Sequence, residues 1–209
     1  MQLSKSLTTA ALVLSASAFA ADYDLDTSHT TAQFAVKHMM VSTVRGTFEK
    51  VTGTATIDDK DITKSKASIS IDVNSVQTRE PKRDAHLKSP DFFDVEKTPN
   101  ITFTSTKVEK AGAGLKITGD LTMHGITKPV TFDATMPTAA QKSPWGSSVR
   151  AISASTKINR KDWNLNWNKA LEAGGLLVSE DVELSFDAEL IEKAPGKPTA
   201  AAPAAPAKK

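Results

Sequence analysis

Apolar and polar residues alternate along most of the chain, the pattern of β-strands that face a core on one side and water on the other. The alternation is clearest near the C-terminus, where every second residue from Val182 to Leu190 is apolar and the residues between them are charged or hydroxylated. Similar runs predict strands at residues 32–38, 44–48, 68–73, 101–104, 116–123, 130–136, 152–158 and 182–190. We therefore expect an all-β protein with eight strands.

Eight one-sided strands joined by short polar turns favour an antiparallel meander. Closing that meander into a barrel removes the two exposed sheet edges that invite aggregation, so we expect an eight-stranded antiparallel β-barrel rather than a sandwich. The segment His124-Gly125-Ile126-Thr127-Lys128-Pro129 is predicted to link two of these strands as a hairpin, because glycine and proline punctuate it.

Two segments interrupt the alternation. Residues 78–89 (TREPKRDAHLKS) have a helix-forming composition, with Thr78 as a candidate N-cap and Pro90 directly after them. They predict one short helix over an end of the barrel. Residues 162–175 are too rich in asparagine and glycine to extend a strand, and whether they gate the barrel is left open.

Both ends of the chain differ from the body in composition. Lys5 precedes an apolar stretch that ends in Ala18-Phe19-Ala20, so residues 1–20 are predicted to be a cleavable signal peptide. A short membrane anchor or a buried helix is the alternative, although the stretch is too short to span a bilayer comfortably. Residues 194–209 are rich in proline and alanine and are expected to form a disordered tail. The folded domain is then residues 21–193, and its expected location is the periplasm.

Composition excludes several kinds of chemistry. With 39% apolar residues the chain suits a compact domain. The formal net charge is only +2, and Lys5, Lys197, Lys208 and Lys209 belong to the two ends, so the body is slightly acidic and unsuited to nucleic acid. The absence of cysteine excludes disulfides, thiolate zinc sites and thiol nucleophiles.

An eight-stranded barrel is either filled by its own side chains or just wide enough for one small ligand. The residues predicted to point inward include five phenylalanines and six small residues. These are Phe34, Phe48, Phe103, Phe132 and Phe186, and Ala32, Gly46, Gly119, Ala134, Ala154 and Ala188. Large and small residues could complement each other in a packed core, or they could leave a tapered apolar cavity. Alternation alone does not choose between these.

Three blocks of the sequence carry a family resemblance. They are YDLDTSHTTAQFAVKHMMVSTVRGTF at residues 23–48, RDAHLKSPDFFDVEKTPNITFTST at 83–106 and LTMHGITKPVTF at 121–132. In order and spacing they resemble the signature blocks of the YceI-like family of exported, lipocalin-like bacterial barrels that bind polyisoprenoids or related long-chain lipids. The similarity covers residues 23–191. A later block, INRKDWNLNWN, departs from the family pattern at Asn164, where glycine is usual and accepts positive φ more freely.

The resemblance implies an apolar tunnel that holds a prenyl or acyl chain lengthwise, and a carrier or sensor with no catalytic residues, no cofactor and no metal. The expected partner is the lipid itself, and the chain is expected to contain no integral membrane segment. The oligomeric state is left open, and a homodimer is one of the alternatives. The residues expected to line the tunnel are Phe34, Val36, Phe48, Phe92, Phe93, Phe103, Met123, Phe132 and Phe186.

Histidines and one arginine supply the candidate polar groups. His38, Arg83 and His86 are predicted to form a polar mouth that hydrogen-bonds a pyrophosphate, quinone or amide head group. The other interpretation of these residues, and of His29 and His124, is hydrogen bonding at turns or the rim. Two further hypotheses stay open: an enzyme that uses His38 or His86 as general acid or base on such a lipid, and a packed, ligand-free stress or interaction barrel.

Overall fold

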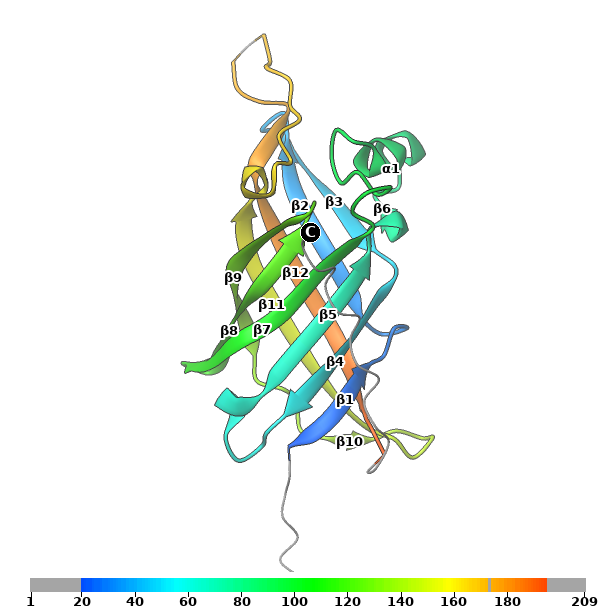
Figure 1. Ribbon diagram of the computed structural model, residues 1–209, viewed down its shortest axis with the longest axis vertical. Helices are drawn as coiled ribbons and strands as arrows, with labels where there is room; N and C mark the ends of the chain where they lie inside the picture. The colour runs from blue at the N-terminus through cyan, green and yellow to red at the C-terminus, as the bar shows by residue number, and fades with distance from the viewer. Residues whose placement is uncertain (1–19, 173, 195–209) are drawn as a thin grey trace, which may run out of the picture.

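Antiparallel strands pair in chain order around a closed barrel in the computed structural model, which describes residues 20–172 and 174–194 (Figure 1). The predicted signal peptide, apart from Ala20, and the predicted tail, apart from Ala194, lie outside the described residues. The strands are β1 (Ala21–Leu25), β2 (Thr31–His38), β3 (Ser42–Phe48), β4 (Val51–Ile57), β5 (Lys66–Asp72), β6 (Val76–Gln77), β7 (Asn100–Ala111), β8 (Gly114–Met123), β9 (Ile126–Thr135), β10 (Gln141–Lys142), β11 (Ser148–Asn159) and β12 (Val178–Glu192).

Three pairs of these segments each act as one interrupted strand. β12 pairs with β2 along most of its length and with β1 near its C-terminal end, so β1 and β2 together form the strand next to β12. β3 and β4 together form the following strand, because β3 pairs with β2 and β4 with β1. β5 and β6 form the strand after that, because β5 pairs with β4 and β6 with β3. The ring then continues through β7, β8, β9 and β11 back to β12. The predicted eight-stranded antiparallel barrel is therefore confirmed, with β10 as a two-residue addition to β11.

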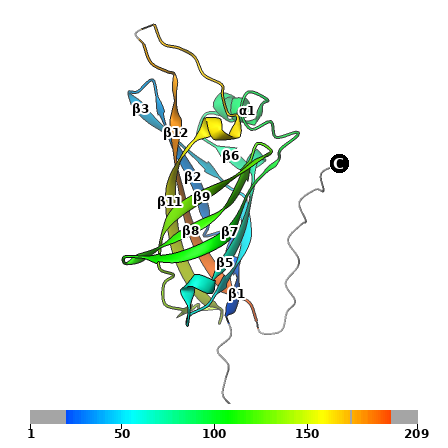
Figure 2. The ribbon, with the colours of Figure 1, turned by 60° about the vertical axis from the view of Figure 1, so that its left-hand side comes forward.

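The predicted helix is present as α1 (Pro81–Lys88), at the same end of the barrel as the turn between β2 and β3 (Figures 1 and 2). The prediction of Thr78 as its N-cap was wrong. Glu80 caps the helix, because Pro81 fixes the first helical position and the Glu80 carboxylate accepts a hydrogen bond from the Lys82 amide at 3.2 Å. The short 3-10 helices η1 (Ile62–Lys64), η2 (Val73–Ser75) and η3 (Arg160–Trp163) complete the fold, with η1 at the opposite end from α1 (Figure 1).

The hairpin between β8 and β9 is tighter than predicted. Its turn is only His124-Gly125, with φ of +49° and +74°, and β9 begins at Ile126. Pro129 therefore lies inside a strand, opposite Asp120. The sheet accepts this proline because β9 pairs with β11 only at Asp133 and Ala134, which leaves the rest of that edge without a partner strand.

Asn164, at the position where glycine is usual in the resembling family, adopts the left-handed backbone conformation. It ends η3 with φ of 58° and ψ of 21°, and its amide donates to the Lys161 carbonyl at 3.0 Å. Asparagine is among the residues that tolerate this region. The turn therefore forms without glycine.

Candidate functional site

The barrel encloses a cavity of about 390 Å³, within the size range of small-molecule sites. Most of the residues that line it are aliphatic or aromatic. At the end near η1 the lining residues Ile57, Ile62 and Leu190 are buried, and Lys66 is exposed. At the other end His38, Arg83 and His86 line it, and the His86 side chain is 37% exposed, so the cavity reaches the surface there. We call this end, beside α1, the mouth.

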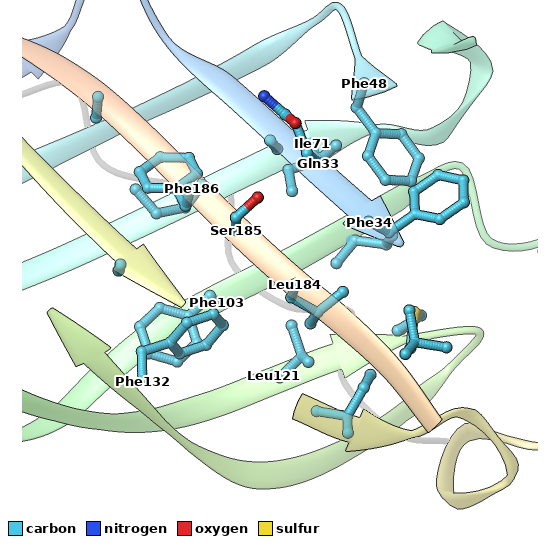
Figure 3. A pocket seen from close by; sticks show the side chains of 18 of the residues that line it. Gln33, Phe34, Phe48, Ile71, Phe103, Leu121, Phe132, Leu184, Ser185 and Phe186 are labelled. Carbon is cyan, nitrogen blue, oxygen red and sulfur yellow. The ribbon is translucent and has the colours of Figure 1, made fainter. Parts of the chain in front are cut away.

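Phenylalanine rings from several strands meet in the cavity (Figure 3). The rings of Phe103 and Phe132 lie edge to face with centroids 5.2 Å apart, and those of Phe34 and Phe48 are 5.8 Å apart. Phe186 projects from β12 into the same space (Figure 3). These rings give the cavity wall an apolar surface with few hydrogen-bonding groups.

Several inward residues keep part of their surface accessible even though the barrel wall covers their outer side. Phe34, Phe103, Phe132, Leu184 and Phe186 are all only partly buried and all line the cavity. Complementary packing would have buried these side chains. The interior is therefore not filled by its own residues, which decides between the two interpretations that the sequence left open.

Two of the small inward residues do not enlarge the cavity. A Cβ atom on Gly46 would lie 2.3 Å from Cζ of Phe34, and one on Gly119 would lie 2.5 Å from Cζ of Phe103. Each glycine is thus covered by an aromatic ring from a neighbouring strand, an arrangement that stabilises glycine within sheets. The free space lies next to other small residues, such as Ala154 on β11, which is partly buried and lines the cavity.

The structure brings together all the residues that the sequence placed in the tunnel and at the mouth. The predicted residues on strands come together because they all lie on the inward side of their strands. The predicted residues between positions 83 and 93 join them because α1 and the turn after it cover the end of the barrel. The residues that line the cavity as predicted are Phe34, Val36, Phe48, Phe92, Phe93, Phe103, Met123, Phe132, Phe186, His38, Arg83 and His86. Their contact with a ligand stays a prediction.

Arg83 is held at the mouth by Thr78. Its Nε donates to Thr78 Oγ1 at 2.8 Å, and its Nη2 donates to the Thr78 carbonyl at 2.7 Å. Asp84 in turn accepts hydrogen bonds from the Thr78 amide, at 2.8 Å, and from its hydroxyl. Thr78 is buried, so this network fixes the guanidinium in place with the charge of Asp84 nearby. Thr78 therefore orients the arginine instead of capping the helix.

His86 belongs to an aromatic cluster that sequence reasoning found only in part. Its ring meets Phe92 and Trp167 edge to face, with centroids 5.0 and 4.8 Å away. Its Nε2 lies 2.8 Å from Asp91 Oδ2, so only Nδ1 is left for a ligand. Trp167 was missed because it lies in an irregular segment, where no alternation shows which way a side chain points.

Arg160 is a second arginine of the cavity wall that the sequence did not reveal. It is 4% exposed, and its Nε donates to the Ser179 carbonyl at 2.9 Å while Nη1 donates to the Leu165 carbonyl. Burial lowers the pKa of its guanidinium below the usual value, and the charge of Glu180 partly opposes that shift. Arg160 thereby joins the start of the segment after η3, at Leu165, to the start of β12, at Ser179.

The other two histidines lie away from the cavity. His124 hydrogen-bonds the Trp163 carbonyl through Nδ1 at 3.0 Å, as expected for a turn residue. His29 Nδ1 lies 2.9 Å from Asp26 Oδ2 and 4.0 Å from Glu189. Hydrogen bonds from Ser28 and His29 lower the pKa of Asp26 to about 2, and Asp26 raises the pKa of His29. Asp26, His29 and Glu189 form the only group of three or more His, Asp or Glu side chains close enough together to hold a metal ion among residues 20–172 and 174–194.

A closed antiparallel barrel with an apolar cavity and a polar mouth is a lipocalin-like barrel, the class in which a single small ligand can occupy the interior. No helix in the described part of the chain is long and apolar enough to cross a membrane.

Comparison with known proteins gives the family. The model of the YceI-like domain matches residues 23–190, and protein YceI of Escherichia coli O17:K52:H18 is 43% identical over 162 residues, 76% of this chain and 84% of that relative. The protein therefore belongs to the YceI-like family. The crystal structure of Campylobacter jejuni YCEI is 31% identical with a TM-score of 0.65, covering 76% of this chain and 90% of that one.

A more distant solved structure shares the fold. It is a polyisoprenoid binding domain from Saccharophagus degradans implicated in plant cell wall breakdown, with 18% identity and a TM-score of 0.57. The match covers 82% of this chain and 98% of that domain. The barrel architecture thus persists at low sequence identity.

Proposed function

We propose that the protein is a non-enzymatic carrier for a polyisoprenoid or another long-chain lipid, held lengthwise in the barrel cavity. The observation that carries this proposal is the unfilled apolar interior, in which partly buried rings such as Phe103, Phe132 and Phe186 leave surface for a ligand to cover. Each methylene buried there contributes about 0.8 kcal/mol, so one isoprene unit contributes roughly 3 to 4 kcal/mol before ordering costs.

Two further observations support the proposed class of ligand and the proposed location of the protein. The name of the Saccharophagus degradans domain favours a polyisoprenoid, and family membership favours an apolar ligand. The predicted signal peptide favours action in the periplasm, where a lipid that leaves one membrane must be shielded from water. A tunnel that only shields a chain needs no reactive group.

Arg83 is the proposed contact for a polar head group. Within the described residues its Nε and Nη2 are engaged by Thr78, and its Nη1 has no hydrogen-bond partner. A guanidinium held in a fixed orientation at the mouth suits a pyrophosphate, quinone or amide oxygen. His38 and the Nδ1 atom of His86 lie at the same end and are proposed to contribute more weakly.

The first test is to purify the exported protein without detergent, extract it with organic solvent and identify small molecules by mass spectrometry. A denatured sample is the control for adventitious lipid. We expect a prenyl or acyl lipid near one equivalent per chain. An extract that stays empty after incubation with polyprenyl lipids would reject the carrier function.

The second test separates the head group from the chain. Arg83→Ala is expected to weaken binding of a polar-headed lipid about tenfold to a hundredfold, because a hydrogen bond to a charged group contributes about 1.5 to 3 kcal/mol. Binding of the bare hydrocarbon analogue should change little. Lys82→Ala, on the exposed side of α1, is the matched control. Equal losses for both ligands would refute the role of Arg83.

A further inference from the structure

The turn between β2 and β3 exposes three large apolar side chains side by side. Met39, Met40 and Val41 have 45%, 66% and 85% of their surface accessible. Isolated exposed apolar residues are common on protein surfaces, but a contiguous group of them is typical of a surface that binds an apolar partner. We call these three residues the hairpin tip.

The backbone of the hairpin tip gives no local reason for these residues. Met39 and Met40 have φ of 53° and 59°, and the Val41 amide donates to the His38 carbonyl at 3.1 Å. A turn with two left-handed central residues is favoured by asparagine and glycine, and side chains such as methionine make it strained. The sequence thus places unfavourable residues in the turn and leaves their side chains in water.

The hairpin tip lies at the mouth. The Met39 amide donates to the Leu177 carbonyl at 2.8 Å, and both Leu177 and the neighbouring His38 line the cavity. Figures 1 and 2 show the β2–β3 turn, the segment that precedes β12 and α1 at the same end of the barrel. Whatever meets the hairpin tip is therefore next to the opening of the cavity.

The charged side chains of the hairpin itself are all positive. From Thr31 to Phe48 the hairpin contains Lys37, His38 and Arg45 and no carboxylate. Among the residues that the structure describes, neither Lys37 nor Arg45 forms an ion pair. The adjacent β12 carries Glu180, which is paired with Lys161 at 2.7 Å, and also Asp181 and Glu183, of which Glu183 lies opposite Ala35. Apolar side chains backed by cations complement a surface with negative head groups above an apolar layer.

We propose that the hairpin tip docks the mouth of the barrel on an anionic phospholipid bilayer, with Met40 and Val41 inserted below the head groups. Lipid then passes between membrane and cavity without crossing water. This inference rests on the proposed carrier function, and it names the membrane surface as the partner of the mouth.

Vesicle flotation tests the docking directly. Vesicles of phosphatidylglycerol and phosphatidylethanolamine are expected to carry the wild-type protein, and the double variant Met40→Ser, Val41→Ser should partition about tenfold to a hundredfold more weakly. High salt should weaken wild-type binding several-fold. The matched control is Trp145→Ser, since Trp145 is 88% exposed on the loop after β10, at the other end of the barrel (Figure 1). It should bind vesicles like the wild type.

A second variant excludes misfolding as the cause. Met39→Asn with Met40→Gly gives the turn residues that suit its backbone, so it should raise thermal stability while it lowers vesicle binding. Unchanged vesicle binding by both tip variants would overturn the proposal and leave a protein as the occupant of this surface. Loss of binding in Trp145→Ser alone would overturn it too, because docking would then involve the other end.

Lipid loading from dilute solution, without vesicles, separates the two proposals. The tip variants should load lipid as the wild type does, because the cavity wall is unchanged. A protein that loads lipid but does not float with vesicles would overturn the docking proposal alone. A protein that floats with vesicles through its tip but never loads lipid would overturn the carrier function.

Discussion

Replacing Ala154 with leucine measures directly whether the barrel interior has room for a ligand. Ala154 lies on β11 opposite Phe186 of β12, partly buried and facing the cavity. Ala188 provides the matched control, because it also lines the cavity and is paired with Ile152 in the same ladder, but is only 4% exposed and so is already covered by its neighbours. The two substitutions add the same atoms to the same pair of strands.

The two variants should change stability in opposite directions. Three added carbons that enter free space contribute about 2 kcal/mol of apolar burial, and fixing the leucine rotamer costs about 0.5 to 1 kcal/mol. Ala154→Leu should therefore stabilise the lipid-free protein by about 1 kcal/mol or slightly more. Ala188→Leu meets atoms already in contact, and such overpacking destabilises by about 1 to 3 kcal/mol.

Lipid affinity should follow the lost space. Leucine at position 154 occupies the room of about three methylenes of the ligand, which corresponds to about 2 kcal/mol or roughly a thirtyfold weaker Kd. Urea denaturation of delipidated protein gives the stability, and titration with a fluorescent long-chain lipid gives the Kd. If Ala154→Leu destabilises as much as Ala188→Leu, or leaves the Kd unchanged, the cavity beside β11 is not where the chain lies.

Three other outcomes are expected. Phe132→Arg places an unpaired charge in the cavity, so lipid titration should show no binding and thermal melting a loss of stability; binding by a folded variant would reject the tunnel assignment. Gly119→Ala brings a Cβ within 2.5 Å of the Phe103 ring and of the Thr104 carbonyl, and should cost about 1 to 3 kcal/mol in urea denaturation. No cost would mean that the ring and the strand adjust freely. The pKa of Asp26 is lowered from 3.8 to about 2, so its ionised form stabilises the fold above pH 4 and this stabilisation is lost as the pH falls toward 2. Asp26→Asn should therefore be about 1 kcal/mol less stable than the wild type at neutral pH and as stable as the wild type near pH 2. An NMR titration of the Asp26 carboxyl at its usual pKa would contradict this.

Alternation predicts the barrel well because each strand has one wet and one apolar side. β1 and β4 were not predicted, since β1 directly follows the predicted signal peptide and the inward positions of β4 include the small residues Gly53 and Ala55. Both segments extend strands that were predicted, so the number of strands in the barrel is unaffected. Small inward residues weaken a periodic signal without weakening the strand.

The cavity wall was predictable from the sequence, whereas the mouth was predictable only in part. Phe34, Phe103 and Phe132 point inward because a strand reverses side at each residue. Arg160 and Trp167 reach the mouth from η3 and the irregular segment after it, where no period fixes direction. The hydrogen bond from Arg160 to the Ser179 carbonyl exists only after β12 has closed the barrel.

Because different interactions build the wall and the mouth, the two parts are expected to select different features of the ligand. The wall is set by ladders of strand pairs, so its width resists change and limits the cross-section of the chain that fits. The mouth is set by side-chain hydrogen bonds from Arg83 to Thr78 and from Arg160 to backbone carbonyls, which can be altered without changing the ladders. Substitutions in the wall should therefore change which chains bind, and substitutions at the mouth should change which head groups bind. Measured on one set of lipids that varies chain and head group independently, the two effects should combine additively for wall and mouth residues that do not touch each other. His86 and Phe92, whose ring centroids lie 5.0 Å apart, should instead show coupling.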